Sequence, residues 1–339
     1  MSAKNDQTRY FPTATQWGTY SVEVEGGRIK ALHDYKEDPA PSIIGGGLVD
    51  AVDDKVRVRR PMVRKSFLEK GLQSNKNDRG TEPFVAVSWD TALDLAAAQI
   101  ERVRKQYGNN SIFASSYGWA SSGRFHHAQS QTHRFMNLAG GYVRHKNSYS
   151  HAAAEVTLKH IVADMKDVIH DQATHWADIA SECELFIAFG GLPHKNAQVN
   201  LGGVGRHTLH EGMQSCYDSG VEFINVSPIR TDIAEMFDPE WIAIRPNTDA
   251  AMMLALAHTL VKEKLYDKNF IASHTVGLEK FLPYLNGDND AQPKDAEWAA
   301  KITGVSAETL INLARRMADC RTMISTAWSL QRSDHGEQP

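Results

Sequence analysis

The sequence predicts an α/β fold in which parallel sheets are flanked by helices, as in Rossmann-like domains. From residue 88 onward, short apolar runs of about three to six residues alternate with segments of helical periodicity. Runs this short are typical of strands that are buried on both faces. Strands that alternate with helices in this way form parallel sheets covered by helices on both faces.

The N-terminal residues 1–60 are predicted to form a small strand-rich region. Ser21 to Val24 and Arg28 to Leu32 alternate in polarity around Gly26-Gly27, which is typical of a hairpin. We therefore divide the chain into this region, a first α/β segment over 61–165 and a dinucleotide-binding α/β domain over 166–339.

The later elements follow from apolar periodicity and capping residues. Ser88 is a good N-cap for a helix that continues through Leu93, Ala97 and Ile100. The expected strands are Ile112–Ala114, Leu185–Phe189, Phe223–Val226, Trp241–Ile244 and Thr322–Ala327. The further expected helices cover 124–139, 151–166, 205–219, 249–264 and 306–319.

Composition and charge exclude several classes of protein. A net charge of -4 without a basic patch argues against a nucleic-acid partner. No apolar stretch is long enough to suggest a membrane span, and the polar N-terminus lacks a signal core, so we expect a cytoplasmic protein, or a periplasmic one if a signal was lost. Three widely spaced cysteines exclude a disulfide framework and a local iron–sulfur or zinc motif, and we interpret them as core thiols.

The loops after the strands are the expected ligand-binding positions, because ligands bind beyond the carboxyl ends of parallel strands. These loops share small residues, amides, hydroxyls and arginines, and they begin at Ser115, Gly190, Asn225, Arg245 and Trp328. Such residues suit the phosphates and ribose of a large nucleotide-like ligand, although ordinary turn chemistry uses the same residues. The absence of G-x-G-x-x-G and of a P-loop motif weakens a nicotinamide dehydrogenase or an NTPase.

Several motifs together resemble one known family. They include Tyr117-Gly118-Trp119, Ser122-Gly123-Arg124, Val87-Ser88-Trp89-Asp90, Asn137-Leu138-Ala139-Gly140-Gly141, Tyr149-Ser150, Ser227-Pro228-Ile229-Arg230, Thr248-Asp249, Trp328-Ser-Leu-Gln-Arg and His335-Gly336-Glu337-Gln338. The sequence resembles the dimethyl sulfoxide reductase family of molybdenum enzymes. The nearest branch lacks iron–sulfur clusters and contains the dimethyl sulfoxide, trimethylamine N-oxide and biotin sulfoxide reductases.

The resemblance implies a bis(molybdopterin guanine dinucleotide) cofactor whose molybdenum is held by four dithiolene sulfurs, an oxo group and one serine. Ser150 matches that serine. A hard alkoxide oxygen suits a high oxidation state better than a soft thiolate does. The alternative is that Ser150 is an ordinary N-cap of the following helix. Ser148 and His151 replace the Asp and Thr that usually flank this motif, so the surroundings of the metal differ.

The resemblance also implies roles for other residues. Tyr117 and Trp119 match side chains that close over the oxo group and donate hydrogen bonds there, although core aromatics are the alternative. The expected cofactor-binding residues are Gly118, Trp119, Lys195, Asn196, Ser227, Pro228, Arg230, Asn247, Asp249, Trp328, Gln331, Arg332 and His335.

The implied reaction is reduction of an S-oxide or N-oxide by oxygen-atom transfer, with electrons from a donor protein or a reduced cofactor. Family chains are longer than this one, so we expect the C-terminal part of the family fold to be absent. Two alternatives stay open. The chain is a truncated, non-catalytic part of such an enzyme, or it is a nicotinamide-dependent α/β oxidoreductase.

Overall fold

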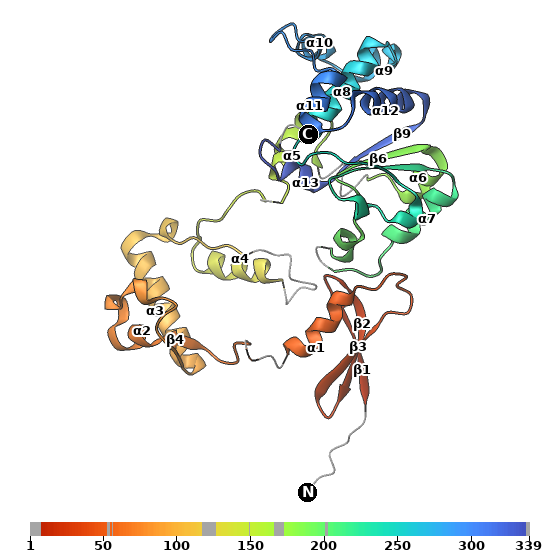
Figure 1. Ribbon diagram of the computed structural model, residues 1–339. Helices are drawn as coiled ribbons and strands as arrows, with labels where there is room; N and C mark the ends of the chain where they lie inside the picture. The colour runs from red at the N-terminus through yellow and green to blue at the C-terminus, as the bar shows by residue number, and fades with distance from the viewer. Residues whose placement is uncertain are drawn as a thin grey trace. The chain divides into compact units, whose positions relative to one another are not determined.

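The computed structural model describes residues 8–52, 55, 57–116, 127–148, 150–165, 173–200 and 203–336. Its contacts divide the chain into two compact units, each described by itself below (Figure 1). Unit 1 contains Met1–Lys146 and Val199–Arg206, and unit 2 contains Asn147–Gln198 and His207–Pro339. The division of the chain at residues 60 and 165 stays a prediction.

Unit 1 begins with an antiparallel sheet of three strands, β1 (Arg9–Thr15), β2 (Gly18–Glu25) and β3 (Arg28–Asp34). The predicted hairpin is confirmed, since Glu25 pairs with Arg28 across the turn. Strand β1 was not predicted individually, because its residues are mostly exposed and include a proline.

The rest of unit 1 consists of short elements around one long helix. They are η1 (Ile43–Gly46), α1 (Gly47–Ala51), β4 (Met62–Arg64), α2 (Lys65–Lys70), η2 (Gly71–Gln73), η3 (Lys76–Asp78), β5 (Phe84–Ala86), α3 (Trp89–Tyr107), η4 (Asn109–Ser111) and α4 (Ala128–Leu138). The Ser88 cap of α3 is confirmed, since its hydroxyl accepts from the amide of Thr91. The expected strand Ile112–Ala114 is wrong: only Phe113 and Val143 form an isolated parallel bridge, and Phe113 is exposed.

Unit 2 is built on a parallel sheet of four strands in the order β8-β7-β6-β9. The strands are β6 (Leu185–Phe189), β7 (Glu222–Val226), β8 (Glu240–Ile242) and β9 (Thr322–Thr326). All four were predicted from their apolar runs. β8 ends before the expected Ile244, because the chain there leaves the sheet and the amide of Arg245 donates to the carbonyl of Thr303.

Helices and 3-10 turns connect these strands. They are α5 (Ala152–Thr157), η6 (Leu158–His160), α6 (Trp176–Glu182), η8 (His194–Gln198), α7 (Leu209–Asp218), η9 (Arg230–Asp232), η10 (Glu235–Phe237), α8 (Asp249–Lys262), α9 (Lys268–His274), α10 (Leu278–Asn286), α11 (Ala296–Thr303), α12 (Ala307–Asp319) and α13 (Trp328–Gln331). The helix expected over 151–166 is shorter, because α5 tightens into η6 where the Thr157 hydroxyl bonds back to the carbonyl of Ala153. Among the described residues, no helix has the length and apolar character that crossing a bilayer requires.

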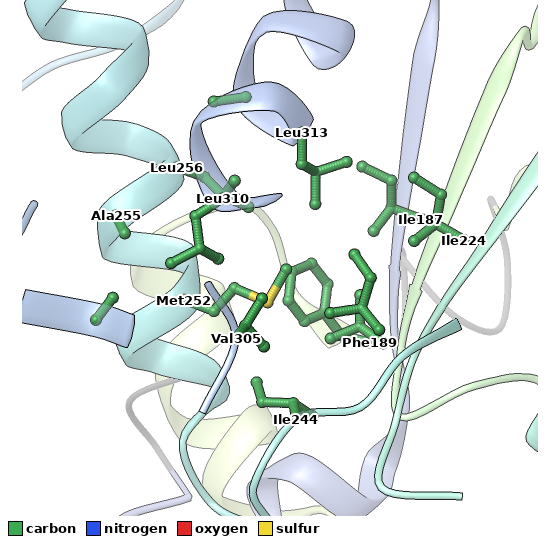
Figure 2. Close-up of a cluster of buried hydrophobic side chains, with 14 of the residues drawn as sticks. Ile187, Phe189, Ile224, Ile244, Met252, Ala255, Leu256, Val305, Leu310 and Leu313 are labelled. Carbon is green, nitrogen blue, oxygen red and sulfur yellow. The ribbon is translucent and has the colours of Figure 1, made fainter. Parts of the chain in front are cut away.

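Alternate residues of the central strand β6 face the two helical layers. Leu185, Ile187 and Phe189 pack in one cluster with residues of α8, α11 and α12, and Figure 2 shows this cluster between sheet and helices. Phe186 and Ala188 pack in a second cluster with residues of α6 and α7. The strand is therefore buried on both faces, as its continuous apolar run predicts.

The first cluster depends on large side chains such as Leu310 of α12, which is fully buried beside Met252 and Val305 (Figure 2). We expect Leu310→Ala to lower the free energy of unfolding by about 2–5 kcal/mol, because it removes apolar contact and leaves a cavity. Urea unfolding measures this change. Leu265→Ala, at a leucine that is 37% exposed, is the matched control and should cost far less. Equal losses in the two variants would contradict this account of the core.

Candidate functional site

The strand order of unit 2 reverses at β6. From β6 the chain passes to β7 and then β8 on one side, and it returns to β9 on the other side. Where two neighbouring parallel strands connect to opposite sides, their loops separate and leave a crevice beyond the carboxyl ends. The carboxyl ends of β6 and β9 are therefore the candidate site in unit 2.

The ends of β6 and β9 lie against each other at this point. The amide of Ala327 donates to the carbonyl of Phe189 over 2.8 Å. Gly190, at φ 84°, follows Phe189, and a Cβ there would lie 2.7 Å from the Cβ of Ala327. Only glycine allows the two strand ends to approach so closely.

The loop after β7 is held by buried polar side chains. The Nδ2 of Asn225 donates to the carbonyls of Ile229 and Arg230, over 3.2 and 2.9 Å. The Ser227 hydroxyl donates to Oδ2 of Asp232 over 2.7 Å and accepts from the amide of Ile229. Asp232 was missed from the sequence, and its only signal was its place five residues after Ser227 in a strand-end turn.

The loops after β6 and β7 are hydrogen-bonded to each other close to a buried side-chain oxygen of Asn225. The amide of Leu192 donates to the carbonyl of Asp232 over 2.9 Å, and a Cβ on Gly191 would lie 2.4 Å from the Cβ of Asp232. Beneath them, Oδ1 of Asn225 is buried and has no hydrogen-bond partner among the described residues. A buried acceptor of this kind fits a donor from a bound ligand or water.

The loop after β8 places one exposed and one buried polar side chain. Asn247 has a left-handed backbone, with φ at 63°, and is exposed. Asp249 opens helix α8 and is only 8% exposed, and this burial raises the pKa of its carboxyl. The Thr248 hydroxyl does not cap the helix and donates instead to the carbonyl of Arg245 over 2.7 Å.

Ser150 lies against the turn that follows β9. Its carbonyl accepts one hydrogen bond from Nε2 of Gln331 and another from Nε of Arg332, the latter over 2.8 Å. Its amide donates to the Ser148 hydroxyl over 3.0 Å. The alternative interpretation of Ser150 as a helix N-cap is wrong, because α5 begins at Ala152 and the cap position is that of His151.

His151 packs on the same turn. Its ring centroid lies 4.6 Å from that of Trp328, and Cζ of Arg332 lies 5.8 Å from the Trp328 ring centroid. The Nδ1 of His151 lies 2.9 Å from Oε1 of Glu155, close enough for an ion pair when the imidazole is protonated, but without the geometry of a hydrogen bond. The structure thus brings together Ser150, Trp328, Gln331 and Arg332, which the sequence proposed separately.

The other expected site residues are more exposed. Lys195 and Asn196 lie in η8, after the β6 loop, and Pro228 and Arg230 lie in the β7 loop. His335 lies beyond α13, with Nε2 3.9 Å from Oδ2 of Asp334. Tyr117, Gly118 and Trp119 fall outside the described residues.

The cysteines fit the interpretation as core thiols. Burial raises the pKa of Cys216 to about 11, and burial also raises the pKa of Cys183. A thiol with a raised pKa stays protonated near neutral pH and is a poor metal ligand. Within the described ranges, no group of three His, Cys, Asp or Glu side chains is placed to hold a metal ion.

Comparison with known protein families decides the affiliation of the chain. The family model described as molybdopterin oxidoreductase matches residues 57–339, and the model described as molybdopterin oxidoreductase N-terminal domain matches residues 13–53. The chain belongs to the molybdopterin oxidoreductase family. The resemblance inferred from the motifs is confirmed.

Relatives of this molybdopterin oxidoreductase chain include three kinds of reductase. It is 41% identical over 326 residues to the dimethyl sulfoxide/trimethylamine N-oxide reductase of Rhodobacter capsulatus, covering 96% of this chain and 39% of that protein. It is 43% identical over 308 residues to the biotin sulfoxide reductase of Cereibacter sphaeroides, covering 91% and 41%. It is 37% identical over 336 residues to the trimethylamine-N-oxide reductase of Haemophilus influenzae, covering 99% and 40%. The chain thus spans about two fifths of the length of these relatives.

Among solved structures, the acetylene hydratase of Pelobacter acetylenicus is similar to this chain. The TM-score is 0.65 at 20% sequence identity, and the match covers 96% of this chain and 42% of that structure. At this identity the similarity supports the α/β fold with its parallel sheet.

The close approach at Gly191 generates a prediction. We expect Gly191→Ala to lower the free energy of unfolding by about 2–5 kcal/mol, because it combines a left-handed backbone with a clash against Asp232. The control Gly220→Ala has a similar φ, 86°, but open space around the new Cβ, so it should cost only about 1–2 kcal/mol. Urea unfolding of both variants gives the difference, and equal costs would refute the clash.

The buried carboxyl of Asp249 generates a pH-dependent prediction. Its raised pKa means that the native state holds this proton more tightly than the unfolded state, in which the pKa is near 3.8. As pH rises from 3.8 through the raised pKa, the carboxyl has to ionise in a buried site, and this lowers the free energy of unfolding. Asp249→Asn lacks this loss, so its stability relative to the unsubstituted protein should increase toward neutral pH.

Urea unfolding across that pH range measures the effect. Asp288→Asn, at an exposed carboxylate in the turn after α10, is the control. If the difference in unfolding free energy between Asp249→Asn and the unsubstituted protein does not vary with pH, burial of the charged carboxylate has no cost.

Proposed function

We propose that this chain forms part of a molybdenum-dependent reductase of S-oxides or N-oxides, with Ser150 as the protein ligand to the metal. The observation that carries the proposal is the position of Ser150. Its carbonyl is held by Gln331 and Arg332 just beyond β9, at the side of β6 where the strand order reverses. The relatives' names supply the reaction class.

The residues present fit a dinucleotide form of molybdopterin, bis(molybdopterin guanine dinucleotide). The buried Oδ1 of Asn225, which has no hydrogen-bond partner within the described part of the chain, supports this fit, because it can accept from a donor of a bound ligand. Asp249, buried at the start of α8, suits the N–H groups of guanine, and Arg230 suits a diphosphate. The sheet then acts as a Rossmann-like support, with loops of adjacent strands along one edge.

Further residues of the proposed site lie in or near the loops that follow the strands. Lys195, Asn196, Ser227, Pro228 and Asn247 line the strand-end loops that receive the dinucleotides. When bound, the cofactor supplies the two-electron oxygen-atom transfer.

We also propose that Tyr117 and Trp119 act as hydrogen-bond donors to the oxo group or the substrate oxygen, and that Gly118 belongs to the cofactor-binding residues. The electrons come from a donor protein or a reduced cofactor. The family assignment favours molybdopterin over the nicotinamide alternative.

The decisive variant is Ser150→Ala. Without the serine oxygen, we expect reduction of dimethyl sulfoxide and trimethylamine N-oxide to be abolished and the molybdenum EPR spectrum to change, since one ligand is lost. Both are measured on the protein as the cell makes it, with molybdenum and pterin contents determined alongside. The control Ser181→Ala removes an exposed hydroxyl that bonds to the carbonyl of Asp178 on α6, and it should leave both readouts unchanged.

If Ser150→Ala retains activity and has an unaltered molybdenum EPR spectrum, Ser150 is not the metal ligand. Purified, unsubstituted protein without molybdenum and pterin would instead favour the non-catalytic partial chain.

A further inference from the structure

The sequence assigned Gln331 and Arg332 to the cofactor, but their contacts are with the backbone of Ser150. We propose that they are positioning residues that orient the serine. This inference rests on the proposed function, in which Ser150 holds molybdenum. The hydroxyl oxygen of Ser150 can rotate about the Cα–Cβ bond, and its position therefore depends on how the backbone of Ser150 is held.

Both backbone polar groups of Ser150 are engaged. The carbonyl accepts from Gln331 and from Arg332, which together use its two lone pairs. The amide donates to the Ser148 hydroxyl, two residues back in the chain. With both peptide groups held, the Cα–Cβ bond of Ser150 has a fixed direction.

The two donors are themselves fixed. The side-chain Nε2 of Gln331 also donates to the carbonyl of Trp328 over 3.2 Å, within the same turn. The guanidinium of Arg332 lies over the Trp328 ring, and the other neighbour of that ring is His151. A planar guanidinium on an aromatic ring is more restricted than a lysine ammonium, so it loses less entropy on bonding.

The turn that carries these donors is anchored in the core of unit 2. Leu330 is 7% exposed and belongs to the cluster that packs against β6. Ala327, one residue before the turn, bonds to the end of β6 through its amide. The position of Ser150 is thereby linked to the most buried strand of the sheet.

A ligand held by a rigid support keeps its geometry through turnover, and partners behind a metal ligand commonly contribute about 10- to 100-fold to activity or affinity. Loss of these hydrogen bonds leaves the serine oxygen in place but lets its direction vary. The expected signature is therefore an altered metal environment and a lower kcat, with substrate binding affected less.

The test uses Gln331→Glu and Arg332→Met, singly and together, in the protein purified with its molybdenum. Glutamate has the shape of glutamine but has no N–H donor when ionised, and methionine replaces the arginine stem without any N–H donor. The matched control is Arg321→Met. Arg321 directly precedes β9, at the amino end of that strand, and its Nε donates to the carbonyl of Glu182 over 2.6 Å.

The readouts are molybdenum content, the molybdenum EPR spectrum, hydrogen exchange of residues 150–157, and kcat and KM. We expect faster exchange, a shifted spectrum and a kcat lowered by about 10- to 100-fold in the double variant. KM should change less than kcat. Arg332→Lys, which keeps the charge but loses the planar donor, should recover only part of the loss. The control should match the unsubstituted protein in all readouts.

Two results overturn the inference. One is a spectrum and exchange rate in the double variant that equal those of Arg321→Met. The other is a change in KM with an unchanged kcat, which would indicate that Gln331 and Arg332 contact the substrate or the cofactor. If the double variant loses its molybdenum, the single variants are judged by the same two criteria. If the EPR spectrum changes in Ser150→Ala but not in the Gln331 and Arg332 variants, only this inference is refuted. If the spectrum does not change in Ser150→Ala either, the proposed function is refuted as well.

Discussion

Burial of the central strands on both faces is the constraint on which the rest of unit 2 depends. β6 and β7 are enclosed by helical layers, so their side chains are apolar except at the ends. Polar groups are excluded from the interior unless they are hydrogen-bonded, and they gather where the strands leave it. The strand-end loops thus combine the most rigid support with the polar chemistry that a ligand needs.

These loops are bonded to one another as well as to the sheet. The buried pair of Ser227 and Asp232 orders the β7 loop, and the amide of Leu192 joins the β6 loop to it. The turn after β9 is joined to the end of β6 and to Ser150. Loops that support each other in this way present ligand-binding groups with little freedom, which reduces the entropy lost on binding.

The sequence predicted the parts of the molecule that depend on periodicity. The apolar runs identified β6 and β7 because burial on both faces leaves a clear pattern, and Ser88 identified the start of α3. The run also identified β9, although that strand is only partly buried. The sequence did not identify β1, which is exposed, and it predicted a strand at Ile112–Ala114 where only a bridge forms. Hydrogen bonds between distant residues, such as those of Gln331 and Arg332 to Ser150, have no periodic signature, because they depend on the folded arrangement of the strands.

The bond between Ser150 and Arg332 joins residues that are 182 positions apart. During synthesis from the N-terminus, Ser150 emerges well before β9 exists, and long-range contacts of this kind form late because their loop must close first. Under the proposed function, the serine gains its fixed direction only after β9 has joined the sheet. The orientation of this serine therefore depends on a segment of the chain that is made 182 residues later.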